Sequence, residues 1–126
     1  MHILIAENRK NVRSAIKLLL EQQPESYLVE EVGTIGDLLE YVANKCPDVI
    51  IIDWDLTEST PGMISALRDS FPHLILIVID SDPLTKNQAF LAGSDYFVSK
   101  NDPPEQLMAA IRDAAKMIET KTVRED

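Results

Sequence analysis

The sequence is poor in the residues that characterise disulfide-linked and membrane-inserted proteins. Its 126 residues include one cysteine, Cys46, so neither an internal disulfide nor a cysteine-rich metal site can form. No apolar run approaches the length of a membrane span, and residues 3–6 are too few for the core of a signal peptide. These absences predict a cytoplasmic protein that does not insert into membranes.

Basic residues are also in short supply. The chain has 12 Lys and Arg against 21 Asp and Glu, which gives a formal net charge of −9 at pH 7. An acidic surface of this kind repels phosphate backbones and anionic lipid headgroups. The chain by itself is therefore predicted to bind neither nucleic acid nor a membrane surface.

What the sequence does contain is the composition of one ordinary globular domain. Hydrophobic residues make up 45% and charged residues 26%, which excludes disordered and collagen-like classes. A chain of this length buries roughly 65–70% of the surface that its unfolded form exposes, enough for one hydrophobic core. We expect a single domain over residues 1–119, followed by a polar tail or the start of a linker at 120–126.

Short apolar runs alternate along the chain with longer segments whose apolar residues recur at helical spacing. Five helical segments alternate with five runs, and residues 57–62 have the composition of a loop. This alternation predicts an α/β fold, a doubly wound parallel sheet covered by helices on both faces. The more polar second strand suits an edge. The predicted strands are 2–6, 27–32, 49–52, 74–79 and 96–98.

Chemically useful side chains follow four of these strands: Glu7 and Asn8, then Asp53, Asp80 and Lys100. Ligands of doubly wound sheets bind beyond the carboxyl ends of the strands, so these side chains should converge on one crevice. Carboxylates a few ångströms apart in a shielded site repel by about 3–4 kcal/mol per pair. Lys100 is the internal counter-charge and Mg²⁺ the external one. The alternative is a set of solvated loop acids in an acidic protein.

Three segments resemble the receiver domains of bacterial two-component response regulators. Residues 45–55 read Lys-Cys-Pro-Asp-Val-Ile-Ile-Ile-Asp-Trp-Asp, residues 92–100 read Ala-Gly-Ser-Asp-Tyr-Phe-Val-Ser-Lys, and residues 104–111 read Pro-Glu-Gln-Leu-Met-Ala-Ala-Ile. The last segment, with the Asn-Asp that follows Lys100, looks most like receivers that precede a LuxR-type helix-turn-helix output domain. The resemblance covers residues 2–118 and implies a flavodoxin-like sheet with strand order 2-1-3-4-5.

By this resemblance Asp53 is the phosphoacceptor, a carboxylate nucleophile that takes a phosphoryl group from a histidine kinase. Lys100 would hold a phosphoryl oxygen. The Mg²⁺ ligands would be Glu7, Asn8, Asp53 and the backbone carbonyl of Asp55.

The resemblance also implies a role and partners. The domain would be a signalling module in a phosphorelay rather than an enzyme, beyond its own phosphoryl transfer and dephosphorylation. It would regulate a DNA-binding output domain in the same chain or a partner protein in trans. A stand-alone receiver and a homodimer remain open alternatives.

Several positions depart from the usual pattern of that family. Asn8 stands where a second acid is usual, so Mg²⁺ is expected to bind more weakly. The hydroxyl usual at the end of the fourth strand is missing, because counting from either side places Asp80 or Val78 there, and Ser81 could serve only in a remodelled turn. The aromatic switch position holds Phe97, which lacks a hydroxyl. A degenerate pseudo-receiver, which binds partners without being phosphorylated, is therefore the main alternative.

A second resemblance concerns residues 51–57. Their sequence, Ile-Ile-Asp-Trp-Asp-Leu-Thr, is similar to the nucleophile motif of haloacid-dehalogenase-like phosphatases, in which Asp53 would attack a phosphate ester and Asp55 would act as general acid. Those enzymes usually carry the motif near the N-terminus, whereas two complete strand–helix units precede it here. The receiver interpretation is therefore favoured.

Overall fold

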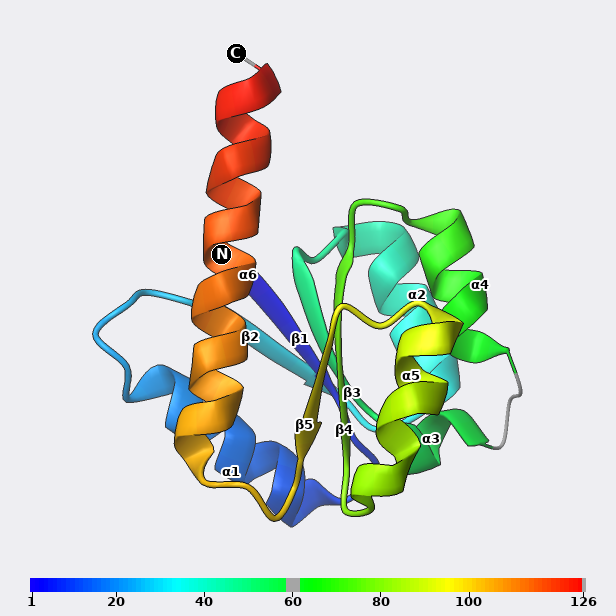
Figure 1. Cartoon of the computed structure of the whole chain (residues 1–126). Coiled ribbons are helices and arrows are strands. Elements are labelled where there is room, and N and C mark those ends of the chain that lie inside the picture. The colour runs from blue at the N-terminus through cyan, green and yellow to red at the C-terminus, as the bar shows by residue number, and fades with distance from the viewer. Residues whose placement is uncertain (59–61, 126) are drawn as a thin grey trace.

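The computed structural model describes residues 1–58 and 62–125, with side chains as far as residue 120. It contains one five-stranded parallel sheet of strand order β2-β1-β3-β4-β5 with helices on both faces (Figure 1). The predicted α/β class, the doubly wound sheet and its strand order are confirmed, and the polar strand lies at an edge. The strands are β1 (His2–Ala6), β2 (Leu28–Val32), β3 (Val49–Asp53), β4 (Ile75–Asp80) and β5 (Tyr96–Ser99).

Two hydrophobic cores lie on opposite faces of the sheet. Helices α1 (Lys10–Glu21) and α6 (Pro104–Glu125) cover one face, and α2 (Ile35–Lys45), α4 (Met63–Ser70) and α5 (Lys86–Ala92) cover the other (Figure 1). Successive strand residues point to opposite faces, so neighbours in the central strands enter different cores. Strand β3 is buried on both faces, which explains its continuous β-branched run.

The turn between β4 and α5 is stabilised locally, and it places one buried hydroxyl. The Asp82 side chain accepts a hydrogen bond from the backbone N–H of Leu84 at 2.9 Å and caps a 3₁₀ turn, η1 (Pro83–Thr85). Proline suits the first turn of a helix, where its missing N–H costs nothing. The turn buries Thr85 directly before α5 begins.

A short helix, α3 (Trp54–Glu58), follows β3, so the prediction of a loop from residue 57 was wrong at its first two positions. The Thr57 hydroxyl donates to the carbonyl oxygen of Trp54 at 2.7 Å, and its side chain is buried. That bond closes a helical turn that composition alone does not reveal. The described residues therefore form six helices, of which five have seven or more residues. Residues 59–61 of the predicted loop lie outside the described residues.

Helix α6 continues beyond the predicted end of the domain. It runs without interruption to Glu125, and its C-terminal part extends past the sheet (Figure 1). The boundary between residues 119 and 120 therefore falls inside a helix, and a functional division there stays a prediction. Among the described residues, we find no helix with the length and apolar character needed to cross a bilayer.

Candidate functional site

Four strands deliver the predicted site residues to one edge of the sheet. Asp53 and Asp80 are the last residues of β3 and β4, and Glu7 and Lys100 directly follow β1 and β5. The backbone N–H of Lys100 donates to the carbonyl oxygen of Asp80 at 2.8 Å, which continues the β4–β5 ladder by one residue. The prediction that residues from distant parts of the chain meet at this edge therefore describes the structure correctly for these four.

Asp53 is fully buried, with none of its surface exposed. The Lys100 ammonium lies 2.8 Å from its Oδ1, whereas its buried Oδ2 has no hydrogen-bond partner among the described residues. Burial raises the pKa of Asp53, and the nearby charges of Glu7 and Asp55 raise it further, against the opposing effect of Lys100. The site therefore holds a carboxylate that Lys100 neutralises only in part.

Lys100 bridges two acids rather than one. Its Nζ lies 2.8 Å from Asp53 and donates to Oε2 of Glu7 at 2.9 Å. Burial lowers the pKa of Lys100, but the hydrogen bonds and charges of Asp53 and Glu7 outweigh that effect and raise the pKa above its ordinary value. Lys100 is therefore held as a cation at the centre of the edge.

Glu7 is fully buried, and both of its carboxylate oxygens have partners. Oε2 accepts from Lys100, and Oε1 accepts from the backbone N–H of Arg9 at 3.3 Å and lies 3.4 Å from the Arg9 guanidinium. Asn8 is exposed, and its backbone carbonyl accepts from Arg13 at 3.3 Å. Two cations therefore engage Glu7, whereas the metal-ligand role of Asn8 stays a prediction.

The end of the fourth strand is occupied by Asp80, which decides between the two residues that counting left open. Strand β4 ends at Asp80, while Val78 is completely buried in the core beneath α2, α4 and α5. Asp80 Oδ2 accepts from the hydroxyl of Thr85 at 2.6 Å, and Oδ1 accepts from the backbone N–H of Ser81 at 2.9 Å. Ser81 thus contacts Asp80 through its backbone N–H.

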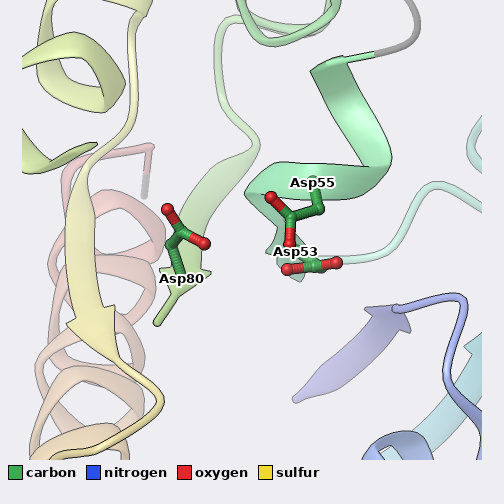
Figure 2. A group of neighbouring side chains, drawn as sticks. All are labelled: Asp53, Asp55 and Asp80. Atoms are coloured by element: carbon green, nitrogen blue, oxygen red, sulfur yellow. The ribbon is translucent and has the colours of Figure 1, made fainter. Parts of the chain in front are cut away.

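Three carboxylates gather above the ends of β3 and β4. One oxygen each from Asp53, Asp55 and Asp80 lies within 4.8 Å of the other two (Figure 2). Carboxylate oxygens are the ligands that Mg²⁺ prefers, and the unpartnered Oδ2 of Asp53 offers one without breaking a bond. The residues present therefore fit a hard divalent cation. Asp80 is the member that the predicted ligand set lacked.

Two more residues bear on the site: Phe97, the predicted switch residue, and Thr85, which contacts Asp80. Phe97 of β5 is half-buried and packs against the core on the side of α2, α4 and α5. Thr85 is the functional residue that sequence reasoning missed, since its hydroxyl reaches Asp80 only because η1 folds back over the strand end. A threonine five residues after a strand-end acid, with proline between them, was the available signal.

Comparison with known proteins now identifies the family. The sequence model of the response regulator receiver domain matches residues 3–112. The chain belongs to the response regulator receiver family. Receiver domains are signalling domains, and this membership decides between the two resemblances in favour of the receiver. It places the chain among the response regulators of two-component systems.

Curated relatives agree with the family assignment. The oxygen regulatory protein NreC of Staphylococcus haemolyticus is 30% identical over 121 residues, covering 92% of this chain and 55% of the relative. NreC of Staphylococcus epidermidis is 29% identical over 117 residues, covering 89% of this chain and 53% of the relative. The receiver chain therefore spans about half the length of these relatives.

Solved structures agree with the fold. NtrX from Brucella abortus in complex with ADP superimposes with a TM-score of 0.86 at 16% identity, over 99% of this chain and 28% of that one. A response regulator receiver domain protein from Clostridium thermocellum gives a TM-score of 0.83 at 20% identity, over 94% and 97% of the two chains. At these identities the likeness establishes the receiver architecture alone.

Proposed function

We propose that this receiver accepts a phosphoryl group on Asp53 from the phosphohistidine of a histidine kinase. The observation that carries the proposal is the asymmetry of the Asp53 carboxylate, which has one oxygen on Lys100 and the other buried without a hydrogen-bond donor. A nucleophilic oxygen must keep an unshared electron pair directed at the incoming phosphorus. Among the described residues, no hydrogen-bond donor occupies an electron pair of Oδ2.

Each residue then has a defined part in the transfer. Asp53 Oδ2 forms the new P–O bond as the P–N bond to the donor imidazole breaks, and the imidazole leaves with the electron pair of that bond. Lys100, already 2.8 Å from Asp53 Oδ1, binds an oxygen of the arriving phosphoryl group as a fixed positive charge. Mg²⁺ bound by Asp53 and Asp55 would supply charge neutralisation at the phosphoryl oxygens.

Phosphorylation by a small donor tests the proposal directly. The protein is incubated with acetyl phosphate and Mg²⁺, and its intact mass is measured. We expect the mass of one added phosphoryl group, absent from Asp53→Asn and retained in the control Asp69→Asn, whose parent residue is exposed on α4. A wild-type protein that gains no phosphoryl group, beside a receiver that does, would favour the pseudo-receiver instead.

The pseudo-receiver is a second candidate because of one observation. Asp80, an acid, occupies the strand end where the family usually has a hydroxyl, and its carboxylate lies near Asp53. Under that alternative the domain would bind partner proteins without phosphorylation.

We further propose an output domain in cis, because the curated relatives are about twice the length of the receiver. A LuxR-type DNA-binding domain is the expected output, with a partner protein in trans as the alternative. Purification of the full natural chain and a titration of duplex DNA would test it.

A further inference from the structure

The strand-end acids of this receiver carry more negative charge than the neighbouring cations balance. Lys100 contacts Asp53 and Glu7, and Arg9 contacts Glu7. Within the described residues, no Lys, Arg or His forms an ion pair with Asp55 or Asp80. Asp55 and Asp80 are therefore held close to Asp53 without an ion-pair partner of their own among the described residues.

Burial makes this arrangement unlike a patch of solvated acids. Asp53 has 0% of its surface exposed and Asp80 has 6%, so water cannot screen these two carboxylates fully. Asp53 Oδ2 is also buried without a hydrogen-bond partner among the described residues. A buried carboxylate that has no hydrogen-bond donor on one oxygen and lies close to two other carboxylates is a favourable place for a cation to bind.

The carboxylate of Asp80 is oriented toward this position by its own partners. Thr85 donates its hydroxyl to Oδ2 at 2.6 Å, and the Ser81 backbone N–H donates to Oδ1 at 2.9 Å. An ionised carboxylate has about four lone-pair sites, so two hydrogen bonds leave each oxygen able to bind a metal. Hydrogen bonds of this kind orient ligating carboxylates in metal sites.

We propose that Asp80 is a metal ligand, and that Asp53, Asp55 and Asp80 bind one hard divalent cation. Asp80 would then supply, from the end of β4, the negative charge that Asn8 does not supply beside β1. Thr85 would be a positioning residue that holds the Asp80 carboxylate. The inference concerns the unphosphorylated protein and does not rest on phosphorylation of Asp53.

Magnesium titration of the unphosphorylated protein tests the ligand role. Trp54 is the only tryptophan and directly follows Asp53, so its fluorescence reports binding, with calorimetry as an independent measurement. We expect Asp80→Asn to weaken Mg²⁺ binding about tenfold or more, and Thr85→Val to weaken it by a smaller factor. Asp69→Asn is the charge-matched control, because Asp69 is exposed on α4 and lies outside the cluster. Its affinity should stay within about twofold of the wild type.

If Asp80→Asn does not fold, a second variant, Asp80→Thr, and backbone NMR of the wild type still test the ligand role of Asp80. Asp80→Thr restores the residue type usual at this strand end and should weaken Mg²⁺ binding as much as Asp80→Asn. In the wild type, Mg²⁺ should shift the amide resonances of Ser81 and Thr85. Equal Mg²⁺ affinity in Asp80→Thr, Asp69→Asn and the wild type, or unshifted amides at saturating Mg²⁺, would overturn the proposal. Loss of binding in Asp53→Asn alone would show a metal site without Asp80 and leave the phosphoacceptor proposal standing.

Discussion

At the scale of single residues, Asp80 departs from the hydroxyl that is usual at this position in receivers. It stands at the end of β4, its oxygens are held by Thr85 and Ser81, and it lies near Asp53. An ionised carboxylate cannot donate the hydrogen bond that a hydroxyl would offer a phosphoryl group. The altered switch stays a prediction, which rests on the position of Asp80 at the end of β4.

Replacement of Asp80 by threonine is predicted to prolong the phosphorylated state. A phosphoryl group carries close to two negative charges, and each repels an ionised carboxylate about 5 Å away by about 3 kcal/mol at an effective dielectric constant of 20. One neutral hydrogen bond contributes only about 1 kcal/mol. The lifetime of phosphorylated Asp80→Thr at saturating Mg²⁺, followed by intact mass, should exceed that of the wild type. A lifetime that is equal or shorter would contradict this account of the switch.

Asp53 is predicted to lower the stability of the metal-free fold at neutral pH. Its folded-state pKa is raised, first by burial, so the ionised carboxylate is less favourable in the folded than in the unfolded chain. The stabilisation by protonated Asp53 is present below the unfolded pKa, about 4, and disappears as pH rises through the folded pKa. Asp53→Asn should therefore raise the free energy of unfolding at pH 7.

Urea denaturation in EDTA measures this effect. The gain from Asp53→Asn should shrink as the pH is lowered toward 4, because the wild-type carboxyl group then becomes protonated. Asp69→Asn, at an exposed position, should show no comparable gain at either pH. A gain independent of pH would mean that the raised pKa is not its cause.

At the scale of elements, one side chain of α4 connects three other elements. Arg68 donates to the carbonyl oxygens of Gly93 at 3.0 Å, Leu74 at 2.6 Å and Pro72 at 3.1 Å. It also pairs with Asp95 at 2.5 Å, whose same oxygen accepts from the backbone N–H of Leu76 at 2.9 Å. Arg68 thereby joins α4 to the end of α5 and to the beginnings of β4 and β5.

Loss of that connection is predicted to destabilise the fold. Arg68→Ala should lower the free energy of unfolding by about 2–3 kcal/mol, because partly buried carbonyl oxygens and the Asp95 carboxylate lose their donor. Arg112→Ala is the matched control, since its pair with Glu25 is half-exposed and should contribute less than about 1 kcal/mol. Equal losses in the two variants would refute the role given to Arg68.

At the scale of the whole molecule, the net charge bears on whether the receiver itself can bind DNA. A domain with a formal net charge of −9 is not expected to attract the phosphate backbone of DNA. The relatives are nearly twice as long as this chain, which leaves room for a second domain. Signalling to DNA would then require a surface outside the receiver.

DNA-binding measurements on the receiver alone test whether its own surface binds DNA. We predict that the receiver at micromolar concentration leaves the fluorescence anisotropy of labelled duplex DNA unchanged, even at low salt, where electrostatic attraction is strongest. A positively charged single-domain DNA-binding protein serves as the positive control. Salt-sensitive binding by the receiver itself would contradict the prediction.

Much of the fold could be predicted from the sequence, because strands and helices each leave a local pattern of apolar residues. Strands with both faces buried, such as β3, need continuous apolar runs, and amphipathic helices need apolar residues at helical spacing. The alternation of these patterns selects a parallel sheet, and the carboxyl ends of parallel strands share one edge. This logic places Glu7, Asp53 and Lys100 together from the sequence alone. Helix α3 could not be predicted in this way, since a single hydrogen bond from Thr57 to a backbone carbonyl leaves no periodic pattern in the sequence.

Only the tertiary structure decided which atoms face each other at that edge. Counting along the chain could not separate Val78 from Asp80, because the choice depends on where β4 ends against β3 and β5. The engagement of Glu7 by Lys100 and the bond from Thr85 to Asp80 join residues through the sheet and through a folded turn. Such contacts depend on distances that sequence spacing does not encode. The sequence thus determined which chemical groups reach the strand ends, and the packing of β4, η1 and α5 determined that Asp80 turns toward Asp53.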